Sequence, residues 1–129
     1  MIETRLIDST KVIKRLQETS DGVLLDVPCS GLGVLRRHPD TKWKMSPAEI
    51  QRLQELQLDL LTRYSSMVKS QGHLVYATCS FLNDENAGVV EKFMAGPEGQ
   101  NWQVIKSINL DPLLDQSDGF FGCLLQKSR

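Results

Sequence analysis

The sequence predicts an α/β fold in which most strands of one sheet run parallel. Short apolar runs at 22–27 and 73–78 are typical of strands buried in the middle of such a sheet. The strongest helical pattern, at 47–69, lies between them and predicts the right-handed crossover that joins parallel neighbours. The last two runs, 102–108 and 119–126, are joined by a link too short for a helical crossover, so we expect an antiparallel final strand.

The remaining elements follow from local patterns of apolar, capping and turn residues. Strands and helices are expected to alternate until the final strand pair, with helices on both faces of the sheet. The predicted elements are a strand at 4–8 ending at Asp8, a helix at 9–18 capped by Ser9, the strand at 22–27, a loop at 28–45, the helix at 47–69, the strand at 73–78, a helix at 84–95 capped by Asn83, a strand at 102–108, a loop at 109–118 and the final strand at 119–126.

The long helix has a clear start and a regular apolar stripe. Ser46, Pro47 and Glu49 form a capping-box pattern, with Ser at the N-cap and Pro at the first helical position. Apolar residues then recur every three or four positions, which indicates core packing. Gly72 suits the exit from this helix.

Composition narrows the class of protein. A chain of 129 residues with a net charge of −1 fits one domain or part of one. Three cysteines without a CxxC spacing, and only two histidines, argue against a disulfide framework and against a bound metal. Without a signal-peptide pattern or an apolar stretch of about 18–20 residues, the default expectation is a reducing cytoplasm and no membrane.

Two cysteines occupy matching positions. Cys29 and Cys79 each follow a predicted buried strand by two or three residues and are each followed by Ser. Because parallel strands end at the same edge of a sheet, both thiols and Asp26 are expected around one site there. A thiolate is soft enough to add to an electron-poor ring carbon, a second thiol can act as a base, and a carboxylate can hold a ring nitrogen.

Three motifs in order resemble one enzyme family. They are Asp-x-Pro-Cys-Ser-Gly-x-Gly with Arg-Arg-His-Pro-Asp, then Tyr-Ala-Thr-Cys-Ser, then Asp-Gly-Phe-Phe, and the match covers about residues 4–127. This pattern resembles the Sun/Fmu (NOL1/NOP2/Sun) family of S-adenosylmethionine-dependent RNA cytosine-5 methyltransferases, which act chiefly on ribosomal RNA. The resemblance implies a Rossmann-like class I methyltransferase fold.

The resemblance also implies roles for individual residues. Cys79 matches the nucleophile that adds to C6 of cytosine, and Cys29 matches the second cysteine, which helps to remove the C5 proton and free the enzyme. Asp26 matches the residue that contacts the N3/N4 edge of the base, and Pro28 shapes that turn. Asp8 matches a position near the adenine of the cofactor. The residues that the resemblance places on the cofactor side of the site are Asp8, Asp26 and Pro28.

A basic segment follows the first cysteine motif. Its exposed charges would suit RNA phosphates, and they are carried by Arg36, Arg37, His38, Lys42 and Lys44. A merely solvated loop is the alternative. Trp43 is equally compatible with stacking on a base and with packing as a hydrophobic side chain on the helix at 47–69.

The chain departs from the family in one respect. The glycine-rich loop and the acidic residue that hold the cofactor's methionine and ribose would precede Asp8, and only seven residues do. We therefore expect residues 1–129 to be the C-terminal part of a methyltransferase domain that is inactive alone. Segment 4–8 then lacks its neighbours and is expected to be displaced, disordered or paired with another copy, since open strand edges invite pairing.

Other readings of the same residues stay open. Cys123 inside the last strand is expected to be a core residue. Cys29 and Cys79 would form a redox pair if their Cα atoms came within about 7 Å. A non-catalytic RNA-binding or interaction module that keeps the fold is the alternative to an enzyme.

Overall fold

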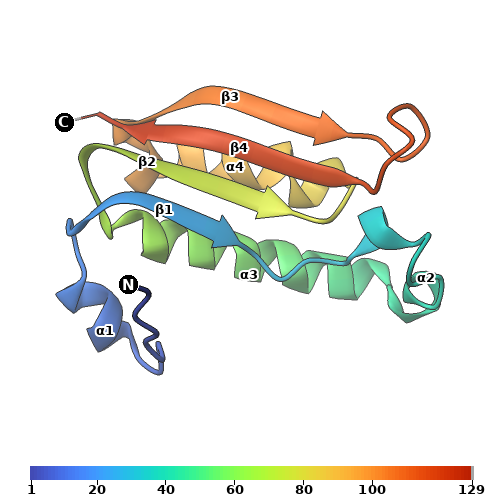
Figure 1. The fold of residues 1–129 in the computed structure, drawn as a ribbon, viewed down its shortest axis with the longest axis horizontal. Helices are drawn as coiled ribbons and strands as arrows, with labels where there is room; N and C mark the ends of the chain where they lie inside the picture. Colours follow the sequence, from blue (N-terminus) through green and yellow to red (C-terminus); the bar gives the residue numbers. More distant parts are fainter. Residues whose placement is uncertain (129) are drawn as a thin grey trace.

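The computed structural model describes residues 1–128 as a four-stranded sheet with helices packed against it (Figure 1). This confirms the predicted α/β class. The elements are α1 (Thr10–Arg15), β1 (Ser20–Asp26), the 3-10 turn η1 (Leu32–Val34), α2 (Thr41–Lys44), α3 (Pro47–Ser65), β2 (Val68–Thr78), η2 (Asn83–Glu85), α4 (Ala87–Ala95), η3 (Glu98–Asn101), β3 (Trp102–Leu110) and β4 (Phe120–Lys127). No helix within residues 1–128 is both long and apolar enough to cross a lipid bilayer.

The strand order is β1-β2-β4-β3. Strands β1 and β2 pair in parallel, and β4 pairs antiparallel with both β2 and β3. Three strands therefore point one way and the final strand is reversed, as predicted (Figure 1). Asp26 lies opposite Ala77, so β1 and β2 end at the same level and the segments that follow them leave one edge together.

The predicted strand at 4–8 is wrong. Residues 1–8 form no helix or strand, and all are exposed. An isolated extended segment has no neighbouring strand to satisfy its backbone groups, which explains why it does not form. The helix after it is shorter than predicted and ends at Arg15; Ser9 stands at its N-cap, but its side chain makes no capping bond.

Helix α3 begins as predicted but ends early. Ser46 Oγ accepts a hydrogen bond from the Glu49 amide at 3.2 Å, whereas the Glu49 carboxylate pairs with Arg52 instead of returning the bond. The helix ends at Ser65 and not at residue 69, because Val68 is already fully buried in the sheet. Gly72 is inside β2, where a Cβ would lie 2.8 Å from the Asp21 carbonyl oxygen, so it permits close strand approach and not a helix exit.

The next helix also starts later than predicted. Residues 83–85 form the 3-10 turn η2, and α4 begins at Ala87 with Asn86, not Asn83, at its N-cap. Asp84 and Glu85, which the predicted helix at 84–95 included, therefore precede the observed helix. This shift buries Glu85 completely.

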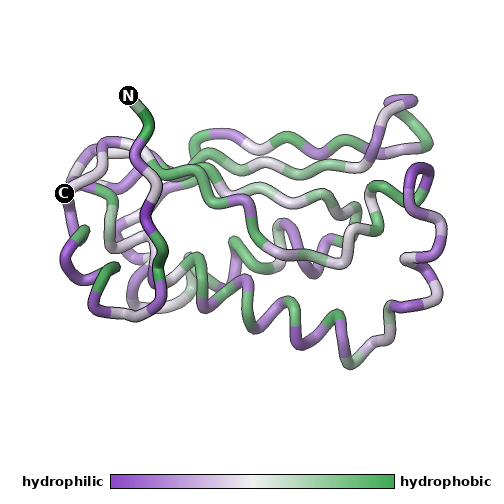
Figure 2. Tube along the Cα trace, turned by 60° about the horizontal axis from the view of Figure 1, so that its bottom comes forward, coloured by the Kyte–Doolittle hydropathy of each residue, from purple (hydrophilic) through white to green (hydrophobic). Residues whose placement is uncertain are grey.

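One face of the sheet carries the core. Helices α3 and α4 contact each other and pack on this face, with Leu61 and Phe93 against Leu74 and Leu125 (Figure 1). The alternation of hydrophobic and hydrophilic residues along α3 is visible in Figure 2. Among residues 1–128 no helix covers the other face, where Leu24 is 72% exposed, so the expectation of helices on both faces is wrong for this chain.

Candidate active site

The two predicted cysteines meet at the carboxyl edge of the sheet. Cys29 follows β1 and Cys79 follows β2, and their Sγ atoms are 3.4 Å apart. Both thiols are free and partly buried. The parallel register of β1 and β2 brings them together, because it places both strand ends at the same level.

Backbone hydrogen bonds join three sequence motifs at this edge. The Gly33 amide donates to the Cys79 carbonyl at 3.0 Å, and the Gly119 amide donates to the Gly33 carbonyl at 2.7 Å. A Cβ on Gly33 would lie 2.3 Å from the Gly119 carbonyl oxygen. Glycine is therefore required there for the two cysteine motifs and the Asp-Gly-Phe-Phe segment to pack together.

The surroundings of Cys29 favour its protonated form. Burial raises the pKa of Cys29, a backbone hydrogen bond involving Gly31 opposes that shift, and the adjacent Cys79 thiol raises it further. Because the neutral form is favoured, Cys29 keeps its proton near neutral pH.

Asp26 and Pro28 lie at the same edge as the thiols. Asp26 is the last residue of β1 and is exposed, on the same side of the sheet as Leu24. The Pro28 carbonyl accepts a hydrogen bond from Gln57 Nε2 of α3 at 3.0 Å, which fixes the turn between Asp26 and Cys29.

Asp8 is not brought to this edge. It is exposed in the N-terminal segment and lines a cavity with Arg63 and Tyr64, which belong to the end of α3 at the opposite side of the sheet (Figure 1). The three residues that the resemblance assigns to S-adenosylmethionine are therefore split between two ends of the molecule. In this arrangement they do not form one cofactor site.

The basic segment is exposed beside the cysteine loops. All five predicted RNA-contacting residues, Arg36, Arg37, His38, Lys42 and Lys44, are exposed. Arg37 Nη2 lies 2.8 Å from Asp118 Oδ2, whereas Lys42 Nζ lies 4.8 Å from the centre of the Trp43 ring. The Trp43 side chain is 81% exposed, so it does not pack against α3 as a hydrophobic side chain.

A cavity of about 350 Å³ lies next to the basic segment. It is bounded mainly by apolar side chains of η1, of the segment after Cys79 and of the β3–β4 loop, among them Leu32, Phe81 and Pro112, with Arg36 and Asp118 at its polar side. Its walls thus come from the same three motifs that meet around the thiols.

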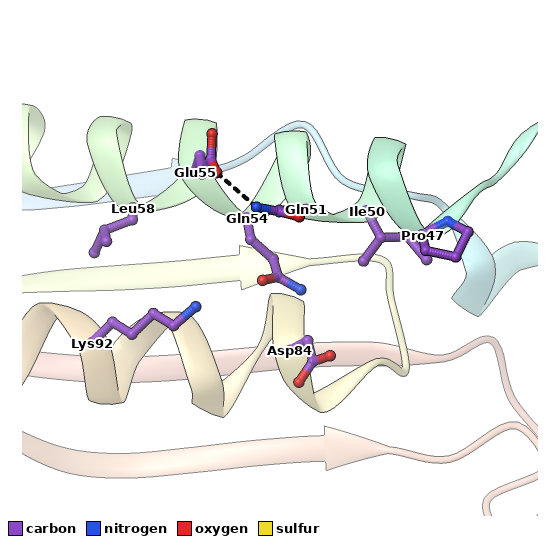
Figure 3. Close-up of a pocket in the computed structure, with 8 residues that line it drawn as sticks. All are labelled: Pro47, Ile50, Gln51, Gln54, Glu55, Leu58, Asp84 and Lys92. Carbon is purple, nitrogen blue, oxygen red and sulfur yellow. Dashed lines mark hydrogen bonds between the residues drawn. The ribbon is translucent and has the colours of Figure 1, made fainter.

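A second groove of about 570 Å³ lies between α3 and the η2–α4 segment (Figure 3). Its walls mix polar and apolar side chains, and Gln51 Nε2 donates to Glu55 Oε1 at 3.3 Å along one side. No residue that the sequence analysis assigned to the site lines this groove. It is a surface between two helices and is separate from the thiol pair.

Sequence reasoning missed the polar cluster beneath the thiols. Ser30 and Ser80, which directly follow the two cysteines, are buried and donate to the carboxylate of Glu85. The repeated Cys-Ser pair was a visible signal. Glu85 was assigned to a helix turn, and only the fold places it between the two loops.

A family model described as "16S rRNA methyltransferase RsmB/F" matches residues 2–126. The "Probable ribosomal RNA small subunit methyltransferase B" of Synechocystis sp. is 38% identical over 130 residues, which cover 90% of this chain and 29% of that protein. The "Ribosomal RNA small subunit methyltransferase B" of Photorhabdus laumondii is 40% identical over 112 residues, covering 83% of this chain and 26% of that protein. The chain thus spans under a third of the length of these relatives.

Solved structures share the fold. The protein solved as PH0851 superposes with a TM-score of 0.80 at 28% identity, covering 86% of this chain and 27% of that one. NSun6 from Pyrococcus horikoshii, solved with SFG, superposes with a TM-score of 0.70 at 23% identity, covering 82% of this chain and 29% of that one. At that lower identity the likeness shows the fold.

Proposed function

The chain belongs to the RsmB/F family of 16S rRNA methyltransferases, and we propose that it supplies the cysteine half of an RNA cytosine-5 methyltransferase site. The family transfers methyl groups from S-adenosylmethionine to ribosomal RNA. The observation that carries the cytosine-5 assignment is the pair of thiols, whose Sγ atoms lie 3.4 Å apart at the carboxyl edge of the sheet.

The thiol pair suits a cycle in which one sulfur attacks and the other handles a proton. The Cys79 thiolate adds to C6 of cytosine, which forms an S–C6 bond and makes C5 nucleophilic. S-adenosylmethionine, when bound, would supply the methyl group by breaking its S–CH3 bond and leaving as the thioether S-adenosylhomocysteine. The C5 proton then leaves to the Cys29 sulfur, which has first passed its own proton to water. The S–C6 bond then breaks, the C5=C6 double bond returns, and Cys79 leaves as the thiolate.

The partial burial of Cys29 supports this division of roles. Burial raises the pKa of Cys29, which makes its thiolate a stronger base for the C5 proton but requires the thiol first to give its own proton to water. Asp26 at the end of β1 is assigned to the N3/N4 edge of the base, and its exposure leaves it open to an incoming nucleotide. The target base must first leave its stack, at a cost of a few kcal/mol.

RNA contact is assigned to the basic segment. Lys42 and Lys44 are exposed and would lie along the phosphates of the flanking strand. Exposed Trp43 is assigned to stacking on an unpaired base, with the Lys42 ammonium near its ring. The open edge strand β1 is where a second copy, or another part of a longer protein, would pair.

We further infer that the isolated chain does not catalyse methyl transfer. Asp8 lies at the opposite end of the sheet from Asp26 and Pro28, so the cofactor-side residues do not converge. The competing assignment, a non-catalytic RNA-binding module, predicts RNA binding without any role for the thiols.

A chimera tests the proposed function. Residues 2–126 replace the matching segment of the Photorhabdus relative, which supplies the rest of that enzyme. The chimera is incubated with unmodified small-subunit RNA and S-adenosylmethionine, and 5-methylcytosine is measured by mass spectrometry of the nucleosides. We expect the mark to form, and to disappear in the Cys79→Ser chimera.

The control is Cys123→Ser, which changes a buried thiol of β4 outside the site. This variant should still form the mark. A Cys79→Ser chimera that methylates as well as its parent would contradict the nucleophile assignment. Methylation at another atom of the RNA would contradict the cytosine-5 assignment.

A further inference from the structure

Beneath the two thiols lies a buried carboxylate with no role in the proposed chemistry. Glu85 is 0% exposed, and its four hydrogen-bond partners are uncharged. A buried carboxylate without a cation is held only when donors converge on it. Its position therefore depends on the segments that supply these donors.

The donors come from both cysteine loops. Glu85 Oε2 accepts from Ser30 Oγ at 2.6 Å and also from Ser80 Oγ, so one oxygen bridges the residues that directly follow Cys29 and Cys79. Glu85 Oε1 accepts from the Ser30 amide at 2.8 Å. The two serine hydroxyls are 3.4 Å apart, the same separation as the two thiols above them.

The direction of these hydrogen bonds is also fixed. Each serine oxygen accepts the amide two residues later, from Leu32 at 3.3 Å and from Leu82 at 3.1 Å. Because an ionised carboxylate can only accept, each hydroxyl donates its proton to Glu85 while its oxygen accepts the amide. The two hydroxyls are used alike, whereas the Ser30 amide donates to Glu85 and the Ser80 amide donates to Thr78 Oγ1.

A neighbouring amide confirms that Glu85 acts as an acceptor. Gln57 Nε2 donates to Glu85 Oε1 at 3.1 Å and to the Pro28 carbonyl at 3.0 Å, while Gln57 Oε1 is buried and finds no partner among residues 1–128. Turning the amide over would set its oxygen against two acceptors. Gln57 Oε1 is therefore left unpaired because Gln57 Nε2 donates to Glu85 and to Pro28.

We infer that Glu85 is a positioning residue, which ties the Ser30 and Ser80 loops together and so sets the spacing of Cys29 and Cys79. Its own backbone is held by Tyr76, whose hydroxyl donates to the Glu85 carbonyl at 2.6 Å. That this thiol spacing matters for catalysis rests on the proposed function. That Glu85 sets the spacing does not depend on it.

The test measures the thiol spacing directly, in the full chain with Cys123→Ala as background. Dibromobimane forms one S–C bond to each of two nearby thiols, releases two bromides and becomes fluorescent. Monobromobimane alkylates single thiols. The ratio of the bridging rate to the single alkylation rate therefore reports how often the two sulfurs are close, and peptide mapping identifies the bridge.

In Glu85→Gln the amide nitrogen would replace an acceptor that both hydroxyls need. We expect the ratio to fall by about tenfold, the size of effect that losing one charge-assisted hydrogen bond produces. Ser80→Ala removes a single donor and should lower the ratio in the same direction. Val68→Ala, at the far end of β2, is the control for general loss of stability and should leave the ratio unchanged.

The inference is overturned if Glu85→Gln and Ser80→Ala both keep the ratio of the Val68→Ala control. If Glu85→Gln does not fold, Ser80→Ala alone decides. The assay contains neither RNA nor methyl donor. A lowered ratio therefore supports the positioning role even if the chimera fails to methylate, and an unchanged ratio contradicts it even if the chimera is active.

Discussion

Cys29 and Cys79 have similar local sequences, and the surroundings of Cys29 favour its protonated form. Burial raises the pKa of Cys29, and the adjacent thiol raises it further because two thiolates 3.4 Å apart would repel each other. The shift means that one sulfur of the pair holds a proton over the range in which a free thiol would lose it.

The raised pKa of Cys29 predicts a pH profile for its alkylation. In the Cys79→Ser variant the neighbouring thiol is gone, but burial, the larger cause, remains. Since only the thiolate reacts, iodoacetamide should modify Cys29 more slowly than glutathione at pH 8 and approach the same rate only at higher pH. Mass spectrometry of the alkylated peptide measures the rate, and a Cys29 that reacts like glutathione at pH 8 would contradict the account.

At this scale the sequence predicts the thiols but not what holds them. Cys29 and Cys79 follow strands whose ends must coincide, so their meeting could be foreseen. Glu85 looked like an ordinary acidic residue near a helix start, because local rules do not show which loops will reach it. Asp8 was placed by analogy, and the loss of its strand moves it away.

At the scale of elements, the site depends on loops that touch backbone to backbone. Gly33 stands between the Cys79 carbonyl and Gly119, where a Cβ would lie 2.7 Å from the first oxygen and 2.3 Å from the second. Backbone atoms cannot move aside as a side-chain end can. The packing of η1 against Cys79 and against Gly119, which directly precedes β4, therefore depends on this glycine.

Gly33→Ala should destabilise the fold by at least about 2 kcal/mol, since overpacking commonly costs 1–3 kcal/mol and here the obstacle is backbone. Gly22→Ala is the matched control, because a Cβ there meets only the His73 oxygen, at 4.0 Å. Urea unfolding gives both values. Equal midpoints for the two variants would show that the loops are not in close contact.

The lengths of the elements were predicted less well than their order. The start of α3 follows from Ser46 and Pro47, whose capping preferences are local. Its end at Ser65 and the early start of β2 at Val68 depend on pairing with β1, which a helical pattern does not reveal. Likewise, segment 4–8 has a strand-like sequence but no neighbour with which to pair.

At the scale of the whole molecule, two exposed surfaces stand out: the uncovered face of the sheet and its carboxyl edge. The open face of the sheet exposes Leu24, and the carboxyl edge combines the thiols, the cavity beside Phe81 and the basic segment. Charge alone does not indicate RNA, since the net charge is −1. The proposed RNA contact rests instead on the exposed cations of the basic segment next to the thiols.

The basic segment predicts how RNA binding responds to salt. If Lys42 and Lys44 each contact a phosphate of single-stranded RNA, changing both to Gln should lower the slope of log affinity against log salt by about 1.4. Lys69→Gln is the control, since Lys69 pairs with Asp21 at the other end of the sheet. Fluorescence anisotropy gives the slopes. An unchanged slope in the double variant would contradict the proposal that this segment contacts RNA.

The unequal roles of the two thiols are tested most directly by trapping the covalent complex between protein and RNA. The chimera with the Photorhabdus relative is prepared as Cys29→Ser, as Cys79→Ser and as the double variant, incubated with RNA and methyl donor, and analysed under denaturing conditions. The account predicts that a covalent complex accumulates with Cys29→Ser, because attack proceeds while release is slowed, and that the other two variants form none. A complex formed by Cys79→Ser, or none formed by Cys29→Ser, would contradict it.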